Sequence, residues 1–447
     1  MTHKASVDSS AASTPGFVSQ IGLQRALAVA EEAAFLWVSR RTVARSSAVT
    51  FDMLARMDER LSRLVYKLSE RPALAEPFLR HDPSAFKPGL AFVTAIVAVR
   101  GRVAEVVDQL LARLESEPEL LSPLASALIW LDYREVRKEV ERLLASTSSS
   151  LLHLGLLIAV AHRVDPGRAL ARAVTADAPP LRASALEAVG RLAVKDLRTK
   201  LHAALGDEDA TCRFWAAWSA LRLGDRDAIP VLGRFAADRG AFARPACEMA
   251  LRGLDLDQAI HAQQRLQSME GNERLAIAAA GIIGDPMLAT RLFDAMKSPL
   301  LARRAGAAFC RMTGCDLRRD DLDTEGPPKG AASNVTPNGD APGVEPIPGA
   351  IGDDLEDEAD DELAWPDTIR LRTWWDGHRQ AFVPGIRYVA GLPVRPTEMT
   401  RVLRTGNQQQ RAAAALELAL LHPDAPMLDV TAPAHRQGGM RTGVDTS

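Results

Sequence analysis

The four cysteines are the first residues whose chemistry can be tested against their spacing. They form no C-x-x-C pair and have no histidine partners at zinc-finger spacing: Cys212, Cys247, Cys310 and Cys315. Cys212, Cys247 and Cys310 lie in apolar runs with helical periodicity. We therefore expect these thiols to be buried as small apolar side chains, which suits a reducing cytoplasm.

Histidines and carboxylates give no recognisable catalytic constellation either. The sequence has no Walker loop, no dinucleotide-binding fingerprint, no H-E-x-x-H and no G-x-S-x-G. His378 beside Asp376 is the local pair that comes nearest to acid–base chemistry, and a surface histidine explains it equally well. We predict a non-catalytic protein with no metal and no cofactor.

Arginine is the polar residue that recurs at a regular step. Five arginines follow one another at intervals of 31, 31, 30 and 30 residues: Arg182, Arg213, Arg244, Arg274 and Arg304. Each opens an alanine-rich run with apolar residues at helical spacing. An arginine at a helix N-terminus opposes the helix dipole and requires a local partner. Since acidic residues lie just upstream, we predict a ladder of Asp–Arg bonds between repeats; a basic stripe for phosphates is the alternative.

Tryptophans are the other residues that could form a binding site. Trp215 and Trp218 lie three positions apart, on one face of an expected helix. They either fill the space between adjacent repeats or form an aromatic patch on a concave surface that anchors a partner. Trp374 and Trp375 belong to a second aromatic-rich stretch, near the C-terminus, which either packs within its module or forms a Trp-rich surface for binding.

These residues are positioned by a repeated pair of helices. After the first helix a glycine or Gly-Asp ends the run, as at Gly284, and Asp285-Pro286 then starts the second helix. Weaker copies extend the pattern towards the N-terminus, giving about seven or eight pairs from 88 to 316. Residues 409–426 read as one more first helix, with Arg411 in the arginine position. With 5 % aromatic residues, the composition favours an all-α solenoid with a period of about 30 residues.

The repeat resembles a known class. The runs GDRDAIPVL and IIGDPMLATRLF resemble HEAT-like repeats, especially the short bacterial variety related to phycobilin-lyase subunits. This resemblance implies architecture and says little about chemistry, since one fold serves many functions.

The ends of the chain and one internal segment depart from the repeat. We predict six regions: a disordered start (1–15), a helical N-terminal cap (16–87), the solenoid (88–316), an acidic, disordered Pro/Gly-rich linker (317–364), a Trp-rich module docked on the solenoid's C-terminal end (365–430) and a disordered tail (431–447). Residues 320–367 carry a net charge of −14, whereas the whole chain carries −3, so the remainder carries +11. The linker is either a solvated spacer or a segment that folds back onto a basic groove.

A second resemblance covers nearly the whole chain. It rests on six runs in this order: EEAAFLW (31–37), LARMDERL (54–61), WPD (365–367), WWDGHR (374–379), RYVAGLPV (387–394) and QQRAAAALELALLHPDAP (409–426). Together they resemble an uncharacterised proteobacterial and myxobacterial family met beside type VI secretion genes. The resemblance implies an accessory adaptor or chaperone role, and it carries over no functional residues.

Three classes of function follow from these observations. The leading one is a cytoplasmic protein-binding scaffold whose partner is another protein, such as a type VI secretion spike-tip or effector component. The alternatives are nucleic-acid binding through the basic body and a DNA-repair-type HEAT-like enzyme. A carboxylate beside Trp215 and Trp218 on the concave face would favour the enzyme. No apolar run is long enough to predict a membrane span.

Overall fold

The computed structural model describes residues 20–81, 87–326 and 362–437. Within these ranges the chain forms 22 α-helices and two short two-stranded sheets, which confirms the predicted all-α class. The predicted disordered start, most of the acidic linker and the last ten residues lie outside the described residues.

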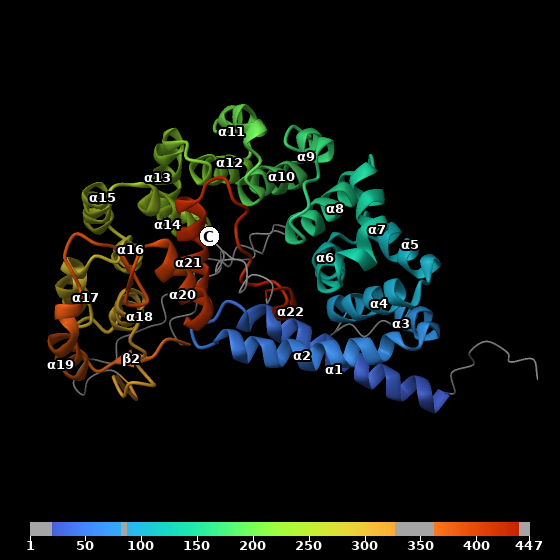
Figure 1. Cartoon of the computed structure of the whole chain (residues 1–447), viewed down its shortest axis with the longest axis horizontal. Helices are drawn as coiled ribbons and strands as arrows, with labels where there is room; N and C mark the ends of the chain where they lie inside the picture. Colours follow the sequence, from blue (N-terminus) through green and yellow to red (C-terminus); the bar gives the residue numbers. More distant parts are fainter. Residues whose placement is uncertain (1–19, 82–86, 327–361, 438–447) are drawn as a thin grey trace, which may run out of the picture.

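The helices are arranged in two curved layers that form an arc (Figure 1). The inner helices pack side by side in chain order: α4 Lys87–Gly101, α6 Leu121–Trp130, α8 Ser149–Ala161, α10 Pro179–Leu192, α12 Ala210–Arg222, α14 Ala243–Gly253, α16 Glu273–Ile283 and α18 Ala302–Thr313. The outer helices cover them: α5 Ala104–Arg113, α7 Tyr133–Ala145, α9 Arg168–Ala173, α11 Arg198–Ala204, α13 Ile229–Ala237, α15 Leu256–Ser268 and α17 Ala289–Ala295. This alternation of inner and outer helices confirms the α-solenoid.

Capping residues in the local sequence form the turns between paired helices. Gly284 ends α16 in a left-handed conformation (φ 69°), and the Asp285 carboxylate then accepts the backbone N–H of Met287. Short 3-10 turns precede several helices: η1 Pro72–Leu74, η2 Pro118–Leu120, η3 Lys195–Leu197, η4 Arg226–Ala228 and η5 Pro286–Leu288. At η4 the cap is Asp225, whose carboxylate accepts the backbone N–H of Asp227.

Small residues allow the inner helices to approach closely. A Cβ added to Gly190 of α10 would lie 2.8 Å from Ser219 Cα of α12, and Gly281 of α16 meets Ala308 Cα of α18 at the same distance. Ser219 donates its hydroxyl to the Leu186 carbonyl across this contact at 2.7 Å. The alanine-rich composition therefore gives a thin core in which backbones are close together.

The N-terminal cap consists of α1 Gln20–Val43, α2 Phe51–Ser69 and the short α3 Ala75–Arg80. Helices α1 and α2 pack against α4, and Trp37 of α1 stacks on Phe92 of α4 with 5.3 Å between ring centroids. The cap thereby covers the apolar face of the first inner helix.

The C-terminal module begins on the last inner helix. Strands β1 Asp323–Thr324 and β2 Trp365–Pro366 pair in antiparallel fashion, so residues 317–326 are ordered although the sequence predicted a disordered linker there. Helix α19 Thr368–His378, the turn η8 Arg379–Ala381 and the hairpin of β3 Tyr388–Val389 and β4 Leu392–Pro393 follow. Backbone bonds from Ala390 to Arg311 and from Gly391 to Met312 fix the hairpin to α18.

The rest of the module turns into the inside of the arc (Figure 1). Helices α20 Pro396–Thr405 and α21 Gln408–Leu421 form a pair that faces α14 and does not continue the inner layer behind α18. Residues 422–437, the C-terminal segment, then cross the inner layer and end in α22 Ala434–Gln437 beside α2. Residues 431–437 were predicted as disordered tail; they are ordered because the solenoid binds their main chain.

Candidate functional site

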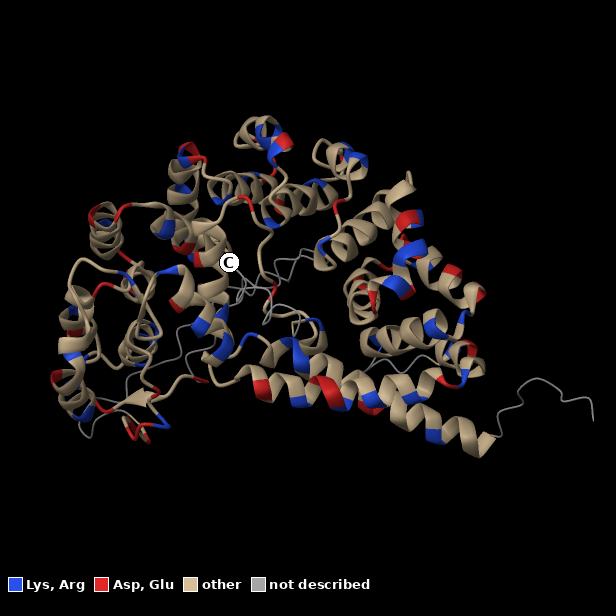
Figure 2. Ribbon diagram, in the orientation of Figure 1, with Lys and Arg blue, Asp and Glu red and all other residues tan. Residues whose placement is uncertain are grey.

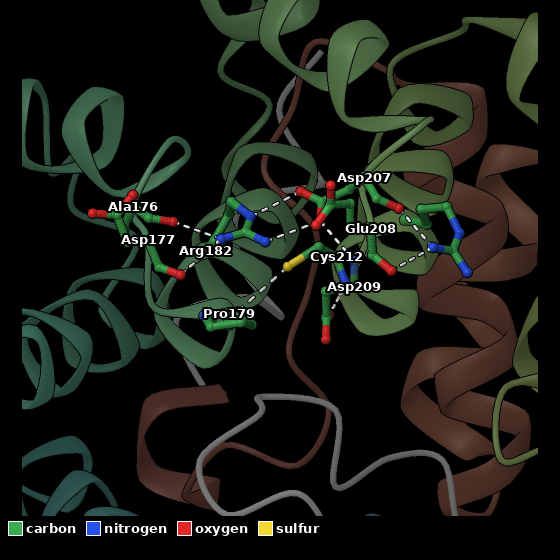
Figure 3. A network of polar contacts seen from close by, with 9 residues as sticks. Ala176, Asp177, Pro179, Arg182, Asp207, Glu208, Asp209 and Cys212 are labelled. Carbon is green, nitrogen blue, oxygen red and sulfur yellow. Dashed lines mark hydrogen bonds and ion pairs between the residues drawn. The ribbon is translucent and has the colours of Figure 1, made fainter.

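The arginine column is seen most clearly at Arg182, in the first turn of α10 (Figure 3). Its Nε and Nη2 donate to the two carboxylate oxygens of Asp207 at 2.8 and 2.9 Å, and Nη1 donates to the carbonyls of Ala176 and Asp177. The Asp207 hydrogen bond raises the pKa of Arg182, and the Arg182 hydrogen bond lowers the pKa of Asp207. Asp207 lies in the following repeat, so this bond links two repeats.

The other arginines also lie in the first turns of inner helices. Arg213 donates Nη1 to the carbonyls of Asp207 and Glu208, which precede its own helix. Arg244, Arg274 and Arg304 lie in the first turns of α14, α16 and α18. Upstream of Arg182 and Arg213 the guanidinium groups thus bind backbone carbonyls and not the acidic side chains that the sequence predicted. The Asp side chain that does bind, Asp207, lies downstream of Arg182.

Arg411 has a different role from the repeat arginines. It is buried, and it donates to the carbonyl of Leu403 and to the side-chain oxygens of Gln408 and Gln437. Its guanidinium also lies 4.7 Å from the ring centroid of Phe51 in the N-terminal cap. Arg411 therefore connects the two ends of the chain rather than two repeats.

Trp215 and Trp218 are buried on the inner side of α12. Their rings meet edge to face at 5.6 Å, and Phe214 packs against Trp215. The apolar cluster that contains them also includes Leu416, with Met427 packed against it. The two tryptophans thus fill space in the core on the concave side, next to Leu416 and Met427 of the chain's own C-terminal part. That they anchor a partner stays a prediction.

Trp374 and Trp375 lie on α19, in the C-terminal module. Both rings pack edge-on against Phe309 of α18, at 6.1 and 5.6 Å, and Trp374 stacks on His378 at 4.1 Å. They are half-buried and attach the C-terminal module to the solenoid. The structure does not bring them to Trp215 and Trp218.

Arginines of the cap and of the solenoid bind the main chain of the C-terminal segment. Arg222 donates to the carbonyl of Ala425, Arg163 donates to that of Met427 at 3.4 Å, and Arg40 donates to those of Thr431 and Ala432 at 3.0 and 3.1 Å. Met427 N–H donates to the Arg191 carbonyl at 2.8 Å. The C-terminal segment is thus recognised largely through its backbone.

The far end of the segment is fixed by two further charged residues. Asp58 pairs with Arg40 and accepts the N–H of Ala434 at 2.7 Å. Arg436 donates to the carbonyls of Ile129 and Ala161, at the ends of α6 and α8. The segment therefore runs from α12 to α2, against the order of the repeats.

The C-terminal segment does not fill the concave face. A cavity of about 190 Å³ lies beside Trp215 and Trp218, and a second of about 180 Å³ lies beside Trp37 and Trp130. Met427, Asp429 and other residues line both cavities, so the cavities flank the segment. Seven arginines line them: Arg40, Arg41, Arg45, Arg163, Arg191, Arg244 and Arg311. The first cavity therefore offers three aromatic residues, Phe214 with the two tryptophans, and the second offers two, each together with several arginines.

Glu248 is the carboxylate that shares the first cavity with Trp215 and Trp218. It contacts Arg252 at 2.8 Å and Arg311 at 3.3 Å, and Arg252 also binds Glu417 of α21. Burial raises the pKa of Glu248, but the attraction of Arg311 and Arg252 outweighs it and lowers the pKa to about 2. Glu248 is thus ionised at neutral pH, as a member of a largely buried ion-pair network.

Arg222 is the residue of this face with the most unusual surroundings. It is fully buried, and within the described residues its Nε and Nη1 have no hydrogen-bond partner. Burial lowers its pKa to about 10, and Asp424 opposes this shift. A buried cation with two unsatisfied donors is costly, so lifting the C-terminal segment would relieve part of that cost by admitting water.

The described part of the chain was searched for metal sites and for membrane-spanning helices. In ranges 20–81, 87–326 and 362–437, no group of three or more His, Cys, Asp or Glu residues is placed to hold a metal ion. Over the same ranges, every helix is too short or too polar to cross a bilayer. The Cys310 and Cys315 sulfurs are 3.3 Å apart, and all four thiols are free.

Of the concave binding residues, Arg40 and Arg163 lie outside any 30-residue column, near the ends of helices, so periodicity does not mark them. Arg222 recurs with Arg191 and Arg252 at steps of 31 and 30 residues, a second column that the sequence analysis missed. The prolines at 423, 426 and 433 are a usable signal, because proline disfavours helix and favours an extended chain.

Comparison with known proteins agrees with this architecture. Residues 168–252, which span α9 to α14, match the profile of the HEAT repeats. The chain is therefore an α-solenoid that contains HEAT repeats. No curated protein and no solved structure matches it.

Proposed function

We propose that this chain is a non-catalytic scaffold that binds another protein on the concave face of its solenoid. The observation that carries the proposal is the C-terminal segment, whose main chain is bound there by Arg40, Arg163 and Arg222. A surface that binds one polypeptide mainly through its carbonyl groups is suited to bind another. Solenoids of stacked helix pairs commonly provide such elongated concave surfaces.

At a finer level, we propose that the scaffold is an adaptor or chaperone for a type VI secretion spike-tip or effector protein, acting in the cytoplasm. Support comes from the resemblance of the N- and C-terminal runs to a family encoded beside type VI secretion genes. The cap run EEAAFLW lies in α1, and WWDGHR lies in α19, so the two ends that resemble the family flank the solenoid.

Affinity purification of the tagged full-length protein from its native host, followed by mass spectrometry, tests both levels. One dominant protein, identified as a spike-tip or effector component, is the expected result. A dominant partner of another kind would contradict the secretion role and leave the scaffold. Recovery of nucleic acid, or of no partner, would contradict both.

A second function is favoured by one observation. Glu248 lines the same cavity as Trp215 and Trp218, which is the combination of carboxylate and aromatic rings that a DNA-repair-type HEAT-like enzyme requires. Incubation with duplex DNA that contains alkylated bases, followed by measurement of free base, tests this function. Base release that is lost in Glu248→Gln would support it, and equal release by both proteins would reject it.

A further inference from the structure

The C-terminal segment binds the solenoid as a separate peptide would. Six residues of irregular backbone separate Ala425, beside α12, from Ala432, beside α1, and Pro426 lies within this stretch. Solenoid side chains bind the carbonyls of Ala425, Met427, Thr431 and Ala432. Since every polypeptide has these carbonyls, the contacts select an extended chain and not a particular sequence.

The charge of the concave face restricts the choice of ligand more than the backbone contacts do. The two cavities beside the segment are lined by seven arginines and two carboxylates, and one of these, Asp429, belongs to the segment itself. Asp424, the segment's other acidic residue, pairs with Lys195 and lies near Arg198 and Arg222. The solenoid wall therefore favours an acidic chain.

Size is the third criterion. A cavity of about 150 Å³ is enough to hold a benzene-sized group. The two cavities, of about 190 and 180 Å³, remain beside Met427 and Asp429 although the segment is bound. The concave face thus has room for two side chains larger than those that the segment supplies, each beside a pair of tryptophans.

We propose that the concave face binds an extended, acidic segment of a partner protein with two large apolar side chains, in the place of residues 424–432. This inference rests on the proposed scaffold function and specifies its ligand. The C-terminal segment is then an internal competitor, which a better-fitting partner displaces from Arg40, Arg163 and Arg222.

A cleavable full-length variant tests the proposal. A site for a sequence-specific protease is inserted between Leu421 and His422, both of which are exposed. Cutting the folded protein turns the C-terminal segment into a non-covalent ligand, and circular dichroism checks that the fold persists. The probe is a fluorescent synthetic peptide of residues 422–437, and its binding is followed by fluorescence anisotropy.

Three competitor peptides then rank the recognition chemistry. The peptide with Met427→Phe is expected to compete about tenfold better than the unlabelled parent, because a larger ring fills the cavity beside Trp215. The peptide with Asp424→Lys and Asp429→Lys is expected to compete at least about tenfold less well, and added salt should reduce this difference. The third peptide, residues 351–367, represents the chain's own acidic linker.

Each outcome decides for or against the proposal. Exchange of the probe with the expected ranking supports it. Loss of the fold on cutting, a segment that no excess of peptide displaces, or equal competition by the charge-reversed peptide would overturn it. Stronger binding of peptide 351–367 than of the Met427→Phe peptide would assign the face to the linker and overturn a partner ligand.

A parallel capture experiment separates this proposal from the scaffold function. Arg41→Glu reverses a charge in the cavity beside Trp130, and Arg25→Glu makes the same change on an exposed site of α1. Loss of partner capture in Arg41→Glu alone supports the concave face. Capture unaffected by both substitutions would overturn the face and leave the scaffold intact.

Discussion

At the scale of single residues, Arg182 shows how one side chain joins two repeats. Its guanidinium and the Asp207 carboxylate form two parallel hydrogen bonds with little exposure to water. We predict that Arg182→Ala lowers the free energy of unfolding by about 2 kcal/mol, measured by urea denaturation. Arg182→Lys should lower the free energy of unfolding by less than Arg182→Ala does, because lysine keeps the charge but lacks the planar fork that binds both carboxylate oxygens.

The control for Arg182 is Arg168→Ala, at an exposed position that begins α9. Surface substitutions of this kind change stability by less than about 0.5 kcal/mol. If Arg182→Ala and Arg168→Ala cost the same, the bond to Asp207 does not stabilise the junction between repeats.

Glu248 gives a prediction for the effect of pH. Its folded-state pKa of about 2 lies below its ordinary value of 4.5, so its contribution is complete above pH 4.5 and is lost as the pH falls towards 2. Glu248→Gln should cost about 3 kcal/mol at pH 7, because it leaves Arg252 and Arg311 with an uncompensated buried charge.

Urea denaturation of both proteins between pH 7 and pH 2.5 measures the Glu248 effect. The gap between them should narrow steadily below pH 4.5, whereas Glu119→Gln, at an exposed site, should match the parent throughout. A gap that stays constant down to pH 2.5 would mean that the ion pairs do not depress the pKa of Glu248.

At the scale of helices, two glycines test the close packing of the inner layer. Gly190 of α10 meets the backbone of Ser219 in α12, whereas nothing lies within 4 Å of a Cβ added to Gly233 in α13. Gly190→Ala should destabilise the fold by about 2 kcal/mol through overpacking. Gly233→Ala should stabilise it by about 0.5 to 1 kcal/mol, because alanine favours the helix. Thermal denaturation that shifts both variants in the same direction would contradict this account of the inner layer.

The helices were also the part of the molecule that the sequence predicted well. Repeat signals such as Gly284-Asp285-Pro286 are local, and the structure uses them as local caps and turns. The strands β1 and β2 were missed because Asp323 pairs with Pro366 and Thr324 with Trp365 across the acidic linker, and no local pattern indicates such a pair. Arg411 opens an alanine-rich helix as the repeat arginines do, yet its contacts with Phe51 and Gln437 come from a tertiary arrangement that the local pattern does not contain.

At the scale of the whole molecule, the C-terminal segment crosses the concave face where several arginines lie. Basic and acidic residues are spread along the whole arc (Figure 2), while Arg40 of the cap and Arg163 and Arg222 of the solenoid bind the main chain of the C-terminal segment. The sequence predicted a basic body with +11 charge and could not locate it, because Arg40, Arg163 and Arg222 are brought together only by the curvature of the arc.

The two ends of the chain are also joined, which distinguishes this solenoid from an open stack of repeats. Gln408 N–H donates to the Val49 carbonyl at 2.8 Å, Thr50 and Asn407 form a β-bridge, and Arg411 lies over Phe51. In an open stack each repeat contacts only its neighbours, so unfolding can proceed from the ends. In this molecule the closure should make the N-terminal cap and the C-terminal module unfold together.

Arg411→Met tests that coupling. The substitution removes the donors to Leu403, Gln408 and Gln437, and we expect a loss of about 3 kcal/mol, because several buried acceptors lose their partner together. Urea denaturation should change from one transition to two, and small-angle X-ray scattering should show a larger radius of gyration. Arg401→Met, on the exposed side of α20, should do neither. One transition with an unchanged radius in Arg411→Met would show that the solenoid keeps its closed arc without the bond between its ends.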